Sequence, residues 1–416
     1  MQRNFASFLL GSLVTLLGLA ACGSEPAPMP TELVPGIEGG LRTGPLEVFV
    51  VDEETGAALS GARVRSGAIE ATTDASGRAS LALEPGAVTL EVQAAGHRAQ
   101  TWSGITGARA IVSVIGEESV LLPVSGELRG LAAAGATSAF VGASAPVRIV
   151  RPETFGAADA PRCELSGEGC GFTLRVAPGI PHHLAAVLVD GAGAPVGIAV
   201  RDRETLGPDP IVIDAAIESG PTETLSVNVP DPGESFAAVV GVPGLAIGGD
   251  VVLLPQTSIG LAQSLAVPAL DGLAESRYWG LFETSPMLGG EPDRSARSVL
   301  FARDLRDGTS APWAYWLDIP ELSVDTAAGT VRVEPISGAR LLVIDSLDAD
   351  GRALASVLHV GELTVASTFA LGATDVDRVI VRAIDTGARP EALSLRDAEL
   401  AVMRFSERTV SLSAAP

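Results

Sequence analysis

The chain has 416 residues, of which 47% are hydrophobic and 4% aromatic, and its formal net charge is −22 at pH 7. This length predicts two to four domains, with cores built from Val, Leu, Ile and Ala. The negative charge argues against nucleic acid as a partner. All basic residues are Arg. P-loop, Schiff-base and Ser-x-x-Lys chemistry, which each need a lysine, are therefore excluded.

The N-terminus has the pattern of an export signal. An apolar run over residues 5–19 follows Arg3 and is too short to span a membrane comfortably. The run ends in Leu19-Ala20-Ala21-Cys22, which resembles the lipobox of bacterial lipoproteins. That resemblance implies removal of residues 1–21 and lipidation of Cys22. The alternatives are an uncleaved anchor helix or an ordinary secretory signal.

Acyl chains on Cys22 would anchor the mature chain, because each buried methylene contributes ~0.8 kcal/mol. The lipid is thus the expected route to a membrane. Gly23 stands where some lipoproteins carry an inner-membrane retention Asp. The resemblance therefore implies the outer membrane of a cell envelope, on its periplasmic or surface face. Residues 22–45 are rich in Pro and Gly, and we expect them to form a partly extended tether.

From Leu46 onward, short strand-like runs alternate with turns. The run over residues 46–52 is followed by turns at Thr55-Gly56, Asp74-Ala75-Ser76-Gly77 and Pro85-Gly86, and residues 88–92 alternate with period two. The turn motifs over 46–116 resemble the carboxypeptidase regulatory-like domain, a transthyretin-like sandwich that serves as an accessory module. The residues that carry the resemblance are Val48, Val50, Asp52, Thr55, Gly56, Leu59, Gly61, Ala62, Val64, Thr73, Asp74, Gly77, Pro85, Gly86, Leu90, Val92, Ala94, Gly96 and His97.

The rest of the chain continues in short strand-like runs, which predicts an all-β protein of tandem β-sandwich domains, transthyretin-like or immunoglobulin-like. We expect a second sandwich over 117–220 and a C-terminal β-rich region over 221–416, divided into two domains near 286–294. Helical patterns are short, and the best candidates for a helix are 258–266 and 393–401. An apolar strand followed by Asp and a Gly-containing turn recurs after Val51, Val189, Ile344 and Ile384.

Besides Cys22, the chain contains only Cys163 and Cys170, which flank a polar, glycine-bearing stretch typical of a loop or hairpin tip. Neighbouring thiols of an exported chain normally pair. We expect a structural disulfide, which contributes roughly 2–3 kcal/mol in the chain-entropy model. Metal binding by the two thiols is the less favoured alternative, because no His is adjacent.

Several motifs suggest chemistry, but each has a simpler structural interpretation. His359-Val360-Gly361-Glu362 resembles the His-x-x-Glu zinc motif of metallocarboxypeptidases, yet no His follows to complete three ligands. On a strand, His182 and His183 would point to opposite faces. Residues 345–351 resemble half of a calcium loop but lack the Glu at position twelve. No Gly-x-Ser-x-Gly elbow is present.

Aromatic residues cluster only around Tyr278-Trp279 and Trp313–Trp316, where a glycan platform is the alternative to core packing. We therefore expect no catalytic residue, no metal site and no cofactor. The predicted function is a lipid-anchored envelope protein whose sandwiches act as a structural module or bind a protein or glycan. The alternatives are an exported hydrolase with an unrecognised carboxylate or metal site, or an accessory subunit of an export complex.

Overall fold

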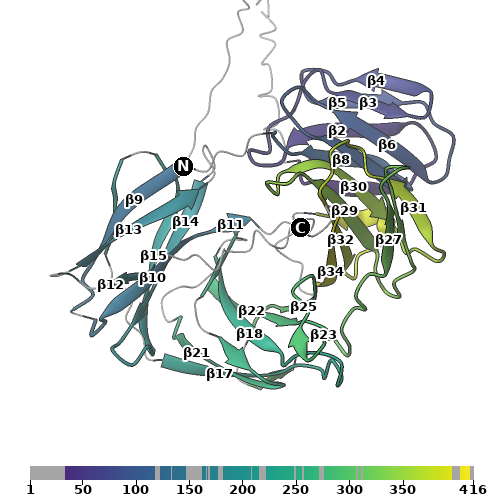
Figure 1. Cartoon of the computed structure of the whole chain (residues 1–416). Coiled ribbons are helices and arrows are strands. Elements are labelled where there is room, and N and C mark those ends of the chain that lie inside the picture. Colours follow the sequence, from purple (N-terminus) through teal and green to yellow (C-terminus); the bar gives the residue numbers. More distant parts are fainter. Residues whose placement is uncertain are drawn as a thin grey trace, which may run out of the picture. The chain divides into compact units, whose positions relative to one another are not determined.

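The computed structural model shows an all-β chain, as the sequence predicts (Figure 1). Across the described residues there is a single short 3-10 helix, η3 (Pro390–Ala392), and no helix is long and apolar enough to cross a membrane. The predicted signal peptide, Cys22 and most of the predicted tether lie outside the described residues. The structure describes residues 33–117, 122–132, 134–146, 162–164, 166, 169–176, 181–207, 209–214, 222–247, 250–254, 257–270, 276–305, 308–310, 313–395 and 403–412.

Local sequence accounts for the strands and turns of the first sandwich. In β6 (Val88–Gln93), Leu90 and Val92 are buried while Thr89, Glu91 and Gln93 are exposed, as period-two alternation predicts. In the turn before β5 (Arg78–Leu81), Asp74 Oδ1 accepts hydrogen bonds from the backbone N–H groups of Ser76 (2.8 Å) and Arg78 (3.0 Å). Gly77 there has φ +73°, and a Cβ would lie 2.7 Å from a backbone oxygen.

The first sandwich begins earlier in the chain than expected. β1 (Gly36–Leu41) pairs with β8 (Gly107–Val114) and with β33 (Leu393–Ser394), so the tether predicted over 22–45 gives way to a strand. The backbone of β1 pairs with strands that are distant in sequence. The Pro and Gly content of residues 22–45 does not reveal such pairing. This outer sheet has the order β33-β1-β8-β2-β5, with β2 (Leu46–Asp52) and β5 (Arg78–Leu81).

The outer sheet packs on a much longer sheet, here called the central sheet, through a shared apolar core that includes Val48, Trp102, Leu358 and Phe405. The strands of the central sheet, in order, are β11 (Ala145–Pro146), β19 (Asp250–Leu253), β18 (Val240–Ile247), β22 (Ser276–Thr284), β25 (Ala296–Ala302), β34 (Arg404–Ser411), β32 (Arg378–Asp385), β29 (Leu341–Leu347), β30 (Ala353–Val360), β7 (Ala99–Ile105), β6, β3 (Arg63–Ser66) and β4 (Ile69–Thr72).

The first sandwich is joined to the C-terminal region within this sheet, because β7 pairs in parallel with β30, from Ala99 opposite Ala355 to Ser103 opposite His359. On the other face of β29, β30 and β32 lies a small cover sheet with a core of its own. All seven residues of β29 are consequently buried. The cover sheet has the order β27 (Leu322–Asp325), β28 (Thr330–Val333), β31 (Ser367–Ala370).

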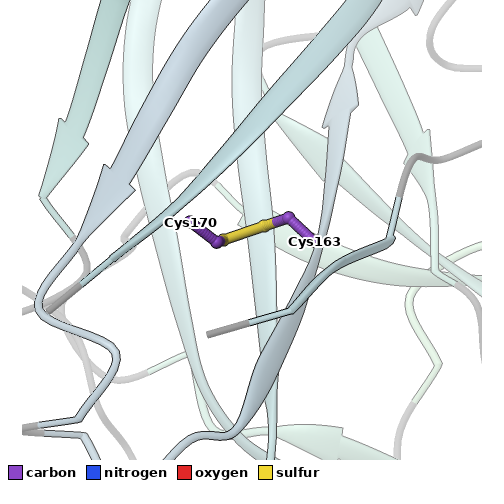
Figure 2. Close-up of a disulfide and its surroundings, with 2 residues drawn as sticks. All are labelled: Cys163 and Cys170. Atoms are coloured by element: carbon purple, nitrogen blue, oxygen red, sulfur yellow. A yellow bond between two sulfur atoms is a disulfide. The ribbon is translucent and has the colours of Figure 1, made fainter. Parts of the chain in front are cut away.

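The second sandwich has two sheets around a separate core. Cys163 and Cys170 are disulfide-bonded, as predicted, with Cα atoms 5.6 Å apart (Figure 2). They are not at a simple hairpin tip, because Cys163 lies in one sheet and Cys170 in the other. The sheets are β12 (Arg162–Glu164), β10 (Ser138–Ala143), β14 (Pro181–Val189), β15 (Pro195–Thr205), and β13 (Gly169–Val176), β9 (Leu122–Arg129), β16 (Ile211–Asp214).

A third core forms where a further sheet packs with β18, β22 and β25. That sheet has the order β21 (Ala262–Pro268), β17 (Thr222–Asn228), β26 (Thr309–Ser310). The helix predicted over 258–266 is wrong, because β20 (Ser258–Ile259) and β21 are strands with partners in two sheets. The predicted boundary near 286–294 is also wrong: it is a hairpin, β23 (Met287–Leu288) and β24 (Glu291–Pro292), between the paired strands β22 and β25.

A candidate binding groove beside the cover sheet

A cavity with polar and apolar walls lies where the central sheet extends past the cover sheet. It has a volume of about 750 Å³ and is lined by β6 and β7, by β30 and by β31. On this face of the central sheet, β31 covers β30. The neighbouring strands β7 and β6 have no such cover in the described structure, and their side chains on this face line the groove. A volume of this size is typical of ligand sites.

Alternation in β7 supplies the floor of the groove. Gln100 and Trp102 are buried in the shared core, so Thr101 and Ser103 must lie on the opposite face, where they line the cavity. Gly104 keeps the neighbouring backbone close: its φ is +77°, and a Cβ there would lie 2.1 Å from the Val360 carbonyl oxygen. Only glycine allows this approach of β7 to the end of β30.

His359 is the main polar group of the groove. Its Nδ1 lies 3.0 Å from Ser103 Oγ, and its ring lies 5.7 Å, centroid to centroid, from that of Phe369 on β31. Burial lowers the pKa of His359 below its ordinary value of 6.5, because desolvation penalises the imidazolium form. The ring is therefore neutral at pH 7 and offers one donor and one acceptor nitrogen.

Polar side chains of β6 that line the groove are paired with arginines on the neighbouring strand β3. Glu91 on β6 forms an ion pair with Arg65 on β3, and Gln93 accepts a hydrogen bond from Arg63. Both contacts are exposed, and an exposed ion pair such as Glu91–Arg65 contributes little to stability. Their effect is to leave the floor polar without a charge excess.

The Ser103–His359 contact has the residue types of a nucleophile and a base, but not their setting. A catalytic base is normally oriented by a third group, most often a carboxylate. Among the described residues, His359 forms its side-chain hydrogen bond with Ser103 and with no carboxylate, and the lowering of its pKa comes from burial. The arrangement offers hydrogen-bonding groups to a ligand.

The structure separates the residues of the zinc-like motif. Glu362 accepts a hydrogen bond from the Gly338 backbone N–H at 3.3 Å, while His359 faces Ser103. Among the described residues no three His, Cys, Asp or Glu side chains are grouped to hold a metal ion. The calcium-like stretch is divided similarly: Asp345 is buried against Arg382 (2.6 Å), and Asp348 Oδ1 accepts a hydrogen bond from the backbone N–H of Arg352.

The remaining histidines are structural. His97 Nε2 lies 2.9 Å from Asp52 Oδ2, which ties two loops of the first sandwich together. Burial raises the pKa of Asp52, but hydrogen bonds from Thr55 and the contact with His97 outweigh this and leave the pKa lowered. His182 and His183 lie on β14 with different burial, as expected for adjacent strand residues, and His182 Nδ1 lies 2.7 Å from the Ser144 carbonyl oxygen.

The aromatic clusters are mostly core. Tyr278, Trp279 and Trp316 are buried, and Tyr315 is the exposed member at 57%. Trp313 and Tyr315 pack against the buried guanidinium of Arg404, whose carbon lies 4.5 Å and 4.1 Å from the two ring centroids. The cluster therefore stabilises an internal cation. A flat platform for sugar rings is not formed by these residues.

Sequence reasoning missed the groove. Thr101, Ser103 and Phe369 carry no motif, and β31 was not among the predicted strands. The available signal was the polar alternation of β6, with Thr89, Glu91 and Gln93 on one face. That pattern predicts a solvent-facing side of β6, but it does not predict that β31 lies beside this side.

No family model and no curated protein matches this chain. A solved structure of a tetra-tandem repeat in the extending region of a large adhesion protein aligns with 12% sequence identity over 89% of this chain and 100% of that chain. Its TM-score is 0.15, which is too low to carry an argument about fold or function.

Proposed function

We propose that the protein is a lipid-anchored component of the cell envelope that binds another envelope molecule and performs no catalysis. The observation that supports a binding role is the groove of about 750 Å³, in which Glu91 is ion-paired with Arg65 and His359 is neutral. The lipobox-like Leu19-Ala20-Ala21-Cys22 supports the anchor. The net charge of −22 supports attachment by lipid in place of attraction to anionic headgroups.

In this proposal the carboxypeptidase regulatory-like resemblance of residues 46–116 fits an accessory role, in which the first sandwich presents a surface. Its inner strand β7 contributes the groove floor, so the module that the resemblance describes is part of the binding face. The hydrolase alternative is less well supported, because no carboxylate acts on His359 in the described part of the chain.

The anchor is tested by labelling cells with a palmitate analogue. The wild-type chain should take up the label and Cys22→Ser should not, and equal labelling of both would refute lipidation. For the binding role, the Cys22→Ser chain serves as non-lipidated bait in a pull-down from isolated envelopes. The bait must keep residues 36–41, because β1 completes the outer sheet.

A further inference from the structure

The two edges of the cover sheet differ in charge. β27 carries Asp325 at its end and follows Glu321 directly, so charges guard that edge. At the other edge, the segment 363–372 around β31 contains no charged residue and no proline. Val365 in that segment is 67% exposed. Natural proteins usually protect an edge strand of this composition, so an unguarded one indicates a pairing surface.

β31 also has a free side in the described structure. It pairs with β28 alone, from Thr330 opposite Ala370 to Val333 opposite Ser367. The Phe369–His359 contact and the approach of Gly372 to Ala355 place β31 over β30. The next strand of the central sheet is β7, and β6 follows it. A strand added beside β31 would therefore lie over β7.

The groove has the dimensions and surface for such a strand. Neighbouring strands lie about 4.8 Å apart and packed sheets about 10 Å apart, so an added strand would occupy the space above Thr101 and Ser103. These small side chains leave room for the side chains of an inserted strand. Thr368 and Phe369 line the same cavity from the β31 side.

Charge selects the kind of strand. The edge segment has no charge, Glu91 is already paired with Arg65, and burial keeps His359 neutral at pH 7. A charged insert would lose hydration without gaining a partner. The complementary ligand is an uncharged extended segment that carries small or hydroxyl-bearing side chains toward the floor.

We propose that the free edge of β31 accepts an extended, uncharged strand of a partner protein, which adds to the cover sheet and fills the groove over β7 and β6. Backbone hydrogen bonds to β31 would supply affinity, and the Thr101–Ser103 floor would supply side-chain selectivity. The inference rests on the proposed binding function and names its site and the chemistry of its ligand.

The probe is a fluorescent synthetic peptide that copies residues 363–372 of this chain, an uncharged sequence that forms a strand. Binding to the full chain with Cys22→Ser is followed by anisotropy, and hydrogen exchange with mass spectrometry locates it. We expect saturable binding and slower amide exchange in 367–370. Absence of binding, or protection elsewhere, would overturn the inference.

Matched variants place a charge on each edge. Thr368 and Ser323 are exposed and lie opposite the same residue, Arg332, on either side of β28. Thr368→Lys should weaken peptide binding at least about ten-fold, whereas Ser323→Lys should change it by less than about two-fold. Equal effects of the two lysines would contradict strand addition at β31. Thr101→Trp tests the floor independently, because the indole would fill the groove and block the peptide.

A neutral oligosaccharide, maltohexaose, tests the competing ligand class. Its binding to the groove in place of the peptide would overturn the strand proposal. Envelope pull-downs with the same variants distinguish a failure of the β31 site from a failure of the proposed binding function. A partner captured equally by Thr368→Lys bait would leave the proposed binding function intact and remove the β31 edge as its site. Capture of no envelope molecule by any bait would count against the binding function itself.

Discussion

The middle of the central sheet and the second sandwich are both all-β, but different interactions stabilise them. Strands β29 and β32 are buried on both faces and contain charged residues that pair across strands. A ladder of alternating charge runs over five neighbouring strands, in the order Asp345, Arg382, Glu407, Arg297 and Glu283. The second sandwich instead has an apolar core and a disulfide between its sheets.

The difference shows how a strand accommodates polar residues once both of its faces are covered. Asp345 and Arg382 have side chains that are 6% and 3% exposed, so neither reaches the solvent and each depends on the other. In the second sandwich, one disulfide links the two sheets, whereas in the central sheet several ion pairs link neighbouring strands. The following experiments test this contrast.

The largest effect should come from the buried end of the ladder. Arg382→Met leaves Asp345 and Glu407 without the guanidinium between them, and we expect a loss of about 3–5 kcal/mol in the free energy of unfolding. Arg297→Met, at the more exposed end, is the control and should cost about 1 kcal/mol or less. Urea denaturation measures both. Equal losses would mean that burial does not set the strength of the ladder.

The junction of β7 with β30 should be the next most sensitive point. Gly104→Ala introduces a Cβ 2.1 Å from the Val360 oxygen at a φ of +77°, and we expect a loss of about 3 kcal/mol. Gly61 is a matched control, since its φ is +78° and no atom lies within 4 Å of its Cβ position. Gly61→Ala should cost about 1 kcal/mol, from backbone strain alone. Similar losses would show that the contact with β30 is unimportant.

Removing the disulfide should have a smaller and more local effect. The paired substitution Cys163→Ala and Cys170→Ala is expected to cost about 2–3 kcal/mol, because the short loop gains conformational entropy when unfolded. Hydrogen exchange should accelerate over 122–214 and remain unchanged over 341–360. Acceleration in both regions would indicate that the second sandwich and the central sheet unfold together.

The smallest effect concerns pH. Because burial lowers the pKa of His359 in the folded state, the unfolded state binds the proton more tightly. The neutral form of His359 contributes fully to the free energy of unfolding above pH 6.5, the ordinary pKa of histidine. This contribution is lost as the pH falls from 6.5 through the lowered pKa of His359 in the folded state. Stability of the wild type should therefore decline more steeply between pH 7 and pH 5 than that of His359→Gln. Parallel curves would place His359 in contact with solvent.

Much of the fold follows from local pattern. The strand ranges 46–52, 88–92 and 341–344 are found in the structure because period-two alternation or a continuous apolar run reports the burial of each face. The Cys163–Cys170 pair was predictable from the spacing of the two cysteines and from the export that the N-terminal pattern predicts. The helix expected over 258–266 was wrong because a short apolar run fits either structure, and pairing with two sheets decided the outcome.

The groove was beyond sequence reasoning for a different reason. Ser103 and His359 are 256 residues apart, and only the parallel pairing of β7 with β30 brings them within 3.0 Å. The sequence pairs His359 with Glu362 in a zinc-like motif, whereas in the structure His359 contacts Ser103 and Glu362 contacts Gly338. Parallel pairing between distant strands leaves no local periodic signal.

The sequence by itself determined the all-β class, the likeness of residues 19–22 to a lipidation signal, and the disulfide, because these depend on neighbouring residues. Tertiary structure alone decided that residues 36–41 are a strand, that the first sandwich continues into the C-terminal region, and that an unguarded edge stands beside an open floor. Backbone hydrogen bonds between strands are not specific to side-chain type, so the choice of distant partner emerges only when whole sheets bury their faces together.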